Sequence, residues 1–208
     1  MDFLNSQQLT YQDGYLHVFR TPGIYEYRVL FLPPGYENSE PDTRYTINVG
    51  KTGSETGKGS QHDVVLHWNA DQHAYHPDPV SVTAQVNDYV LWHVETDTPA
   101  APPYGIRGEN ETHTVFDSRG MGQHDVLTHM FLTPGEYHYK VNNQAEGVVL
   151  VASHKNLPYE VHAERAANAP LVHIAGGIPN PDSVEIVTGQ TVVWFVEEGE
   201  RVTVTLLK

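Results

Sequence analysis

The chain of 208 residues contains no cysteine, which excludes disulfide bonds, thiolate metal ligands and cysteine nucleophiles. It has no run of about 18 apolar residues, the length that a membrane-spanning helix requires. Its first residues, MDFLNSQQL, show neither the basic start nor the apolar stretch of a secretory signal. We therefore expect no export signal and no membrane span in the sequence as given, and the compartment has to be argued from other features.

Basic residues are also scarce. The chain has 12 Lys and Arg against 26 Asp and Glu, and a net charge of −14. A field of this sign repels phosphate backbones and attracts cationic molecules. The charge balance therefore argues against nucleic acid as a partner and favours a basic one.

No segment keeps a helical period of apolar residues over several turns, whereas short alternating segments are frequent. The 12 Tyr, 17 Gly and 14 Pro favour short strands joined by turns, so we predict an all-β protein. A single short helix is expected at Glu160–Ala167. The clearest predicted strands are Val64–Trp68, Ser81–Ala84, Tyr89–Val94, His113–Phe116, Tyr137–Val141 and Gly147–Ala152.

Two motifs in the chain occur twice. FRTPGIYEYRV at 19–29 recurs as FLTPGEYHYKV at 131–141, 112 positions later. PDPVSVTAQVNDYVLWHV at 77–94 recurs as PNPDSVEIVTGQTVVWFV at 179–196, 102 positions later. Both motifs join turn residues to a strand-like pattern, so the sequence indicates a duplicated β domain.

The order of the four motifs predicts how two domains are assembled. Residues 62–153 contain an opening half followed by a closing half, which predicts one contiguous central domain. Residues 1–50 hold only a closing half and residues 165–208 only an opening half, and either alone would expose apolar side chains and unpaired strand edges. We therefore predict a composite domain made of 1–50 plus 165–208, with 51–61 as a linker and 154–164 as a connector. Exchange of these halves between two molecules is the alternative.

Several elements in a fixed order resemble the cupredoxin family, the small blue-copper proteins such as plastocyanin. They are a strand ending in V-x-W, then H-T-V, then F-x-x-P-G-x-Y-x-Y, then G-x-V-x-V, and together they cover nearly all of the chain. The resemblance implies two Greek-key β-sandwiches, one contiguous and one assembled from the N- and C-terminal segments. It does not by itself imply the family's function.

The ligand positions of a blue-copper site are largely lost. Such a site needs two imidazoles, a thiolate and a weak axial thioether. The positions that the resemblance implies are His113, Val141, Gln144 and Ala145 in the central copy, and Val202 and Val29 in the composite copy. Only His113 keeps a ligand, so we expect no type 1 copper and no cofactor. The paired H-x-H motifs of multicopper oxidases are absent as well.

Histidines offer an alternative, a Cu(II) or Zn(II) site built from imidazoles. The candidates form two groups, His62, His67, His73 and His76 in one and His113, His124 and His129 in the other. The first group matches no compact zinc pattern, and we interpret it as surface histidines. His129 has a counterpart in His17, two residues before the aromatic residue of each repeat, which favours a structural role. A further hypothesis is pH sensing, because protonating all 13 histidines would take the net charge from −14 to −1.

Catalytic patterns are missing. The chain has no G-x-S-x-G, H-E-x-x-H, P-loop or Gly-rich dinucleotide turn. A triad of Ser118, His124 and Asp125 fails because neighbours on an extended segment point to opposite faces. We therefore expect no enzyme activity and name no catalytic residue.

Two Pro-rich segments are predicted to be long surface loops, Leu30–Tyr45 and Glu95–Thr112. Long loops in compact domains are often functional, and exposed tyrosines are effective anchors for a protein partner. The candidates for partner binding are Tyr36, Tyr45 and Tyr104.

The sequence thus favours a non-catalytic, copper-free binding or structural protein that acts as an accessory subunit. By analogy with acidic sandwiches that meet basic electron-transfer proteins, its expected host is an extracytoplasmic or periplasmic, membrane-bound redox complex. A histidine-based metal-binding or copper-handling protein is the competing hypothesis.

Overall fold

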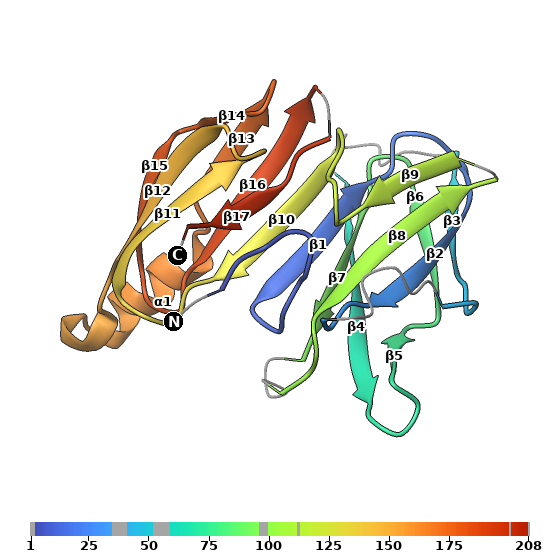
Figure 1. Ribbon diagram of the computed structural model, residues 1–208, viewed down its shortest axis with the longest axis horizontal. Helices are drawn as coiled ribbons and strands as arrows, with labels where there is room; N and C mark the ends of the chain where they lie inside the picture. The colour runs from blue at the N-terminus through green and yellow to red at the C-terminus, as the bar shows by residue number, and fades with distance from the viewer. Residues whose placement is uncertain are drawn as a thin grey trace. The chain divides into compact units, whose positions relative to one another are not determined.

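The computed structural model describes residues 3–34, 41–51, 59–95, 100–111, 113–199 and 201–207. These residues fold into two compact units. The N-terminal unit is Gln7–Arg119, and the C-terminal unit combines Met1–Ser6 with Gly120–Lys208. Strands make up most of both units, and the expectation of an all-β protein is confirmed (Figure 1).

The N-terminal unit consists of two layers of antiparallel and parallel strands. One layer has the order β1-β7-β4-β5 and the other the order β6-β3-β2-β8-β9. Rings from both layers meet in the core, where Trp92 lies 5.3 Å from Tyr27 and 5.3 Å from Phe116 between ring centroids. The strands are β1 (Asp13–Val18), β2 (Gly23–Phe31), β3 (Tyr45–Gly50), β4 (Gln61–Asn69), β5 (Ala74–Asp78), β6 (Ser81–Gln85), β7 (Tyr89–Val94), β8 (Tyr104–Asn110) and β9 (His113–Asp117).

The C-terminal unit has the same two-layer plan. Its layers are β14-β13-β16-β10 and β15-β12-β11-β17, and Tyr139 of one packs edge-on against Trp194 of the other at 5.5 Å. Residues near the N-terminus join this unit, because Ser6 N donates to Val204 O. The elements are β10 (Asp125–Met130), β11 (Gly135–Val141), β12 (Ala145–Ala152), a 3₁₀ turn (His154–Asn156), α1 (Tyr159–Ala167), β13 (Leu171–Ala175), β14 (Ile178–Asn180), β15 (Ser183–Val187), β16 (Thr191–Glu198) and β17 (Val204–Leu206).

The two units share the same pattern of strand pairing. β3 runs parallel to β6 and β2 antiparallel to β8, just as β12 runs parallel to β15 and β11 antiparallel to β17. The turns repeat as well, since Asn87 N donates to Phe19 O in one unit and Gly189 N to Phe131 O in the other. The sequence repeats therefore mark two copies of one domain that follow each other along the chain, and β9 belongs to the first copy alone among the named strands.

This arrangement corrects the predicted domain assembly. Of the segment 1–50, only the first six residues join the unit that contains 165–208; β1, β2 and β3 pair instead with β7, β8 and β6. The predicted central domain, 62–153, is divided between the two units at Arg119. A sequence repeat shows which segments are alike, but it does not show which closing half pairs with which opening half. Pairing between halves that are neighbours in sequence closes shorter loops and therefore costs less entropy. The predicted linker 51–61 lies within the N-terminal unit, and 52–58 fall outside the described residues.

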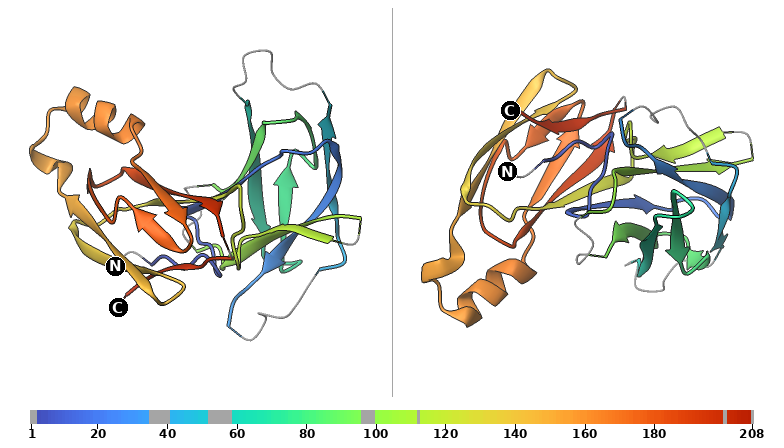
Figure 2. Two further views of the ribbon diagram at one scale, coloured as in Figure 1. Left: turned by 90° about the horizontal axis from the view of Figure 1, so that it is seen from above. Right: turned by 60° about the horizontal axis from the view of Figure 1, so that its bottom comes forward.

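The six predicted strands are all present, and the helix expected at Glu160–Ala167 is confirmed as α1. α1 lies on the outside of its sandwich and buries none of its residues (Figure 2). It is attached by His162 Nε2, 3.0 Å from Thr188 O, and by Gln190 Nε2, which donates to Asn168 O at 2.5 Å. Among the described residues, no helix is long and apolar enough to cross a membrane.

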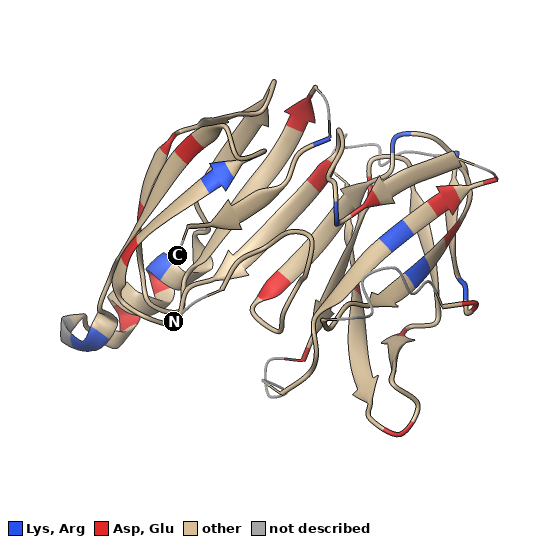
Figure 3. Ribbon diagram, in the orientation of Figure 1, with Lys and Arg blue, Asp and Glu red and all other residues tan. Residues whose placement is uncertain are grey.

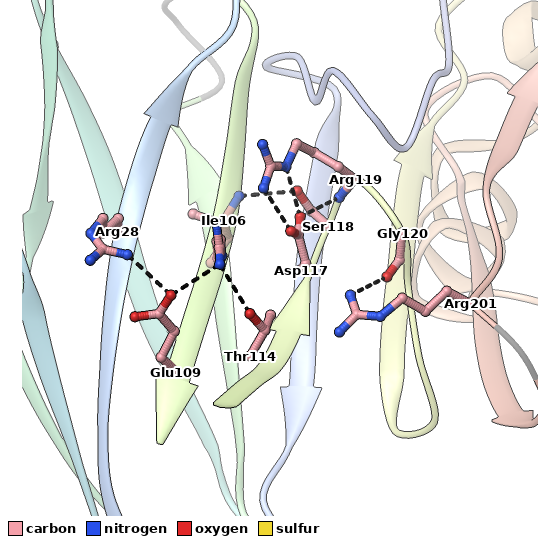
Figure 4. A network of polar contacts seen from close by, with 10 residues as sticks. Arg28, Ile106, Glu109, Thr114, Asp117, Ser118, Arg119, Gly120 and Arg201 are labelled. Atoms are coloured by element: carbon pink, nitrogen blue, oxygen red, sulfur yellow. Dashed lines mark hydrogen bonds and ion pairs between the residues drawn. The ribbon is translucent and has the colours of Figure 1, made fainter. Parts of the chain in front are cut away.

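Charged side chains tie β2, β8 and β9 together on their outer face, where basic and acidic residues lie on neighbouring strands (Figure 3). Arg28 and Arg107 stand directly opposite each other, and both reach Glu109, at 3.4 and 3.1 Å (Figure 4). Asp117 accepts two hydrogen bonds from the Arg119 guanidinium, at 3.0 and 2.8 Å. The basic residues of this face are thus paired with carboxylates.

A buried carboxylate, Asp88, closes the turn between β6 and β7. It accepts hydrogen bonds from Ser60 N at 2.8 Å and Gln85 N at 2.9 Å, and it lies 2.9 Å from His62 Nε2. Burial acts to raise the pKa of Asp88, but these hydrogen bonds outweigh it and hold the pKa below the ordinary value of 3.8. In the C-terminal unit the neutral Gln190 takes this position, and its Oε1 accepts from Val187 N at 3.1 Å.

Replacing Asp88 with asparagine should destabilise the N-terminal unit by about 2 kcal/mol at neutral pH, because one amide cannot accept all of these hydrogen bonds. The folded-state pKa of Asp88 is lower than its unfolded value, so the carboxylate stabilises the fold above about pH 4 and loses this effect as the pH falls. Urea unfolding at pH 7 and pH 3 would measure the difference. A Gln190→Ala variant serves as the control, since its cost should not change with pH; an equal cost of Asp88→Asn at both pH values would contradict the assignment.

Candidate functional site

A pocket of about 220 Å³ opens on the N-terminal unit where β2 ends and β3 and β5 begin. Its walls come from three segments that are distant in sequence, because the sheet order brings these strand ends together. The lining residues are Val29, Phe31, Pro41, Thr43, Tyr45, His73, Ala74, Tyr75 and His76. A larger and more open depression, of about 590 Å³, lies beside β11, β12 and β15 in the C-terminal unit. Its described lining has no aromatic ring, so we take the smaller pocket as the candidate site.

Aromatic rings run from the pocket into the core. Phe31 stacks on Trp68 with ring centroids 5.1 Å apart and planes inclined by 13°. Trp68 lies 5.0 Å from Tyr75, which in turn lies 5.6 Å from the fully buried Tyr104. Phe31 and Trp68 are half-buried, so part of each ring remains accessible. The wall is stiff because each ring rests on another.

The tyrosines of the pocket are neutral hydrogen-bonding groups. Tyr75 is buried and its hydroxyl donates to Pro102 O. Burial raises the pKa of both Tyr75 and Tyr45 above the ordinary value of 10.0. Deprotonation of either phenol near neutral pH is therefore unfavourable, and the rings present apolar faces with polar edges.

Two histidines stand at the rim, His73 on the turn between β4 and β5 and His76 within β5. His73 has a left-handed backbone, with φ of 48°, and its ring lies 6.1 Å from Phe31. Asn69 Oδ1 accepts hydrogen bonds from Asp71 N and Gln72 N, at 3.1 Å each, which shapes the turn that holds His73. His76 Nε2 lies 2.6 Å from Gln72 Oε1. The turn thus positions His73, and β5 positions His76, beside the aromatic wall.

Of the three tyrosines proposed as partner anchors, one lines the pocket and one is buried in the core. Tyr45 is half-buried and lines the pocket. Tyr104 was expected to be exposed, and this was wrong: it lies in β8 with no exposed surface, and its hydroxyl donates to Asp13 O at 2.9 Å. Tyr36 lies outside the described residues. The segment Glu95–Thr112, predicted as a loop, contains β8.

The positions predicted from the copper motif are divided between the two units. Val29 and Val141 are buried at equivalent positions of β2 and β11, opposite Ile106 and Val204. Gln144 is exposed in the turn after β11, and Ala145 begins β12. His113 is exposed at the start of β9. It belongs to the N-terminal unit, whereas Val141 belongs to the C-terminal unit.

The predicted match of Val202 with His113 is wrong. Val202 forms a bridge with Met121, as Tyr104 does with Leu9, so Val202 corresponds to Tyr104. The H-T-V segment belongs to β9. In the described part of the C-terminal unit, the segment that pairs with β17 beside β11 is the N-terminal one, where Asn5 bridges Thr205. Sequence similarity in a short Thr-Val pattern was too weak to distinguish these strands.

The alternative metal ligands are divided between the units: His113 belongs to the N-terminal unit, and His124 and His129 belong to the C-terminal unit. Within the described ranges, no group of three or more His, Cys, Asp or Glu is arranged to hold a metal ion. His129 is buried and packs edge-on against Phe131 at 4.7 Å, as His17 does against Phe19 at 4.9 Å. This repeated contact agrees with the structural role that the sequence indicated.

Sequence reasoning missed Phe31, Trp68 and Tyr75 as site residues. The usable signal was their position, since Phe31 ends a strand, and Trp68 and Tyr75 flank the turn that carries His73. Half-buried aromatic residues at strand ends are good candidates for a binding pocket.

Comparison of the chain with models of known families, with curated proteins and with solved structures found no match.

Proposed function

We propose that this protein is a non-catalytic binding protein that recognises a basic partner protein through the aromatic pocket of its N-terminal unit. The observation that carries the proposal is the wall formed by Phe31, Tyr45 and Tyr75 on a chain with a net charge of −14. Aromatic faces attract cations, and the acidic field would guide a basic protein towards the chain.

The pocket suits the head group of an arginine or lysine side chain. Such cations bind over the face of Trp, Tyr or Phe within about 6 Å of the ring centre, with Arg the more frequent partner. Phe31 and Tyr45 are half-buried rings that line the pocket, and the buried Tyr75 forms part of its inner wall. Pre-ordered rings lose little conformational entropy on binding, which favours affinity.

We further propose that the two sandwiches are copper-free, cupredoxin-like domains. Support comes from the motifs shared with that family and from the aliphatic side chains of Val29 and Val141, which are buried where a thiolate would be needed. We assign no catalytic residue and no cofactor. The host assembly that we propose is an extracytoplasmic, membrane-bound redox complex, on the basis of the resemblance alone.

The pocket is tested with defined cations. Titration with N-acetyl-arginine amide and with tetramethylammonium, followed by tryptophan fluorescence or by NMR, should show saturable binding. A Phe31→Ala, Tyr45→Ala double variant should bind about tenfold more weakly, because two of the cation–π contacts are lost. Phe3→Ala, which removes an aromatic ring that is 42% exposed in the other unit, is the matched control. Equal binding by wild type and the double variant would refute the role of the pocket.

The partner can be identified with a cross-linker placed at position Thr43, which lines the pocket, after the protein is mixed with native membranes and extracts. We expect one basic protein, captured less at high salt because screening weakens the long-range attraction. The double variant should lose the same partner. Recovery of free protein only, at all salt concentrations, would count against the proposed function.

A further inference from the structure

We propose that His67 and His76 form a two-imidazole site for Cu(II) on the outer face of the β4–β5 hairpin. The two residues stand directly opposite each other in the antiparallel register. Residues in this relation project from the same face, with Cβ atoms about 5 Å apart. Both side chains are exposed, so an ion from solution can reach them without a change in the fold.

An oxygen atom lies beside each ring, and at His76 it is within hydrogen-bond distance. His67 Nδ1 lies 3.6 Å from Glu95 Oε2, and His76 Nε2 lies 2.6 Å from Gln72 Oε1. A metal-binding histidine usually directs its other ring nitrogen to such an oxygen, which fixes the ring and raises its basicity. The nitrogens assigned to copper are therefore His67 Nε2 and His76 Nδ1.

The local charge favours a cation. Asp78 stands opposite Val65, two residues before His67 on the same exposed face of β4, and Glu95 lies beside His67. Imidazole is a good ligand for Cu(II), which binds such sites more tightly than the other divalent first-row ions. With two protein ligands the remaining positions around the ion are taken by water. The site is thus an open one, which agrees with the absence of any set of three ligands among the described residues.

The duplicated domain provides an internal comparison. The hairpin of β13 and β14 corresponds to β4 and β5, and at the equivalent positions it places Ala175 opposite Ile178. The imidazole pair therefore belongs to the N-terminal copy. It is also distinct from the former copper positions, since neither Val29 nor His113 takes part.

The test is a Cu(II) titration of the full chain at pH 7.5, against a competing chelator and followed by electron paramagnetic resonance. We expect the chain to bind one equivalent of Cu(II) tightly, through two nitrogen ligands. His67→Ala should lower the affinity for this ion about 100-fold. Two ligands held on one chain gain from their effective concentration, and loss of one ligand removes that gain. His76→Ala should act similarly, but His76 also lines the pocket, so His67→Ala is the decisive variant.

The matched control is His138→Ala. His138 is exposed and lies 2.9 Å from Glu136, but it stands opposite Val148 rather than a histidine. Its replacement, like that of His113, should leave the tight equivalent unchanged. Tight Cu(II) binding that survives His67→Ala, or that disappears with His113→Ala, would overturn the assignment. Wild-type binding no tighter than that of a His67→Ala, His76→Ala double variant would overturn it as well. The Phe31 and Tyr45 variants should still bind copper, so failure of the proposed function and of this site can be distinguished.

Discussion

Replacing Gly108 with alanine is expected to destabilise the N-terminal unit by about 3 kcal/mol. Gly108 stands opposite Phe116 in the β8–β9 pair, and the ring of Phe116 lies over its Cα. A methyl group at Gly108 would lie only 1.9 Å from the ring carbon Cζ. Phe116 is fully buried and packed against His17 at 4.7 Å and Trp92 at 5.3 Å, so the ring has no space into which to move.

Unfolding by urea, followed by circular dichroism, would measure the loss. Gly120→Ala is the control, because the nearest atom to its added methyl group is a flexible Arg201 side-chain carbon at 3.7 Å. A second substitution, Phe116→Leu, should recover part of the stability of Gly108→Ala by shortening the side chain above it. Unchanged stability of Gly108→Ala would mean that Phe116 does not cover Gly108.

Replacing Trp92 with alanine should cost about 4 kcal/mol, the usual range for removal of a fully buried tryptophan. Trp92 has no exposed surface, and Tyr15, Tyr27 and Phe116 surround its ring at centroid distances of 5.9, 5.3 and 5.3 Å. These rings come from both layers of the unit, so the cavity cannot close by a local shift. The expected result is a large drop in the unfolding midpoint of the N-terminal unit in a thermal or urea titration.

Two further variants calibrate this effect. Trp194→Ala removes the corresponding ring of the C-terminal unit and should be similarly costly for that unit. Trp68→Ala removes a half-buried ring and should cost clearly less. If Trp92→Ala were no more destabilising than Trp68→Ala, the core would not lie where the structure places it.

The class of fold could be read from the sequence because alternation and turn residues act locally. The strands around Trp92 and Tyr139 and the helix α1 are examples. The pairing of the copies could not be read, because each closing half carries the same pattern and is compatible with either opening half. β8 was missed because Gly105 and Gly108 weaken the strand signal. Those glycines are needed for packing, since a Cβ at Gly105 would lie 2.8 Å from Leu32.

The candidate site was only partly predictable. Tyr45 and Val29 were singled out and do line the pocket, although Val29 was chosen for its place in a copper motif. Tyr104 was misjudged because a tyrosine beside prolines looks like a loop residue, whereas strand geometry turns it into the core. The opposed pair of His67 and His76 depends on strand register, which the spacing of histidines along the chain does not reveal.

Because the two copies have matching strand register, residues at equivalent positions can be compared to see where the copies have diverged. At the same place in the fold, one copy has an imidazole pair and the other has Ala175 and Ile178; one has the ionisable Asp88 and the other Gln190. After duplication, selection can alter one copy while its sister maintains the original architecture. Grafting residues from either copy into the other then becomes a direct way to learn which differences were acquired for recognition and which are neutral drift.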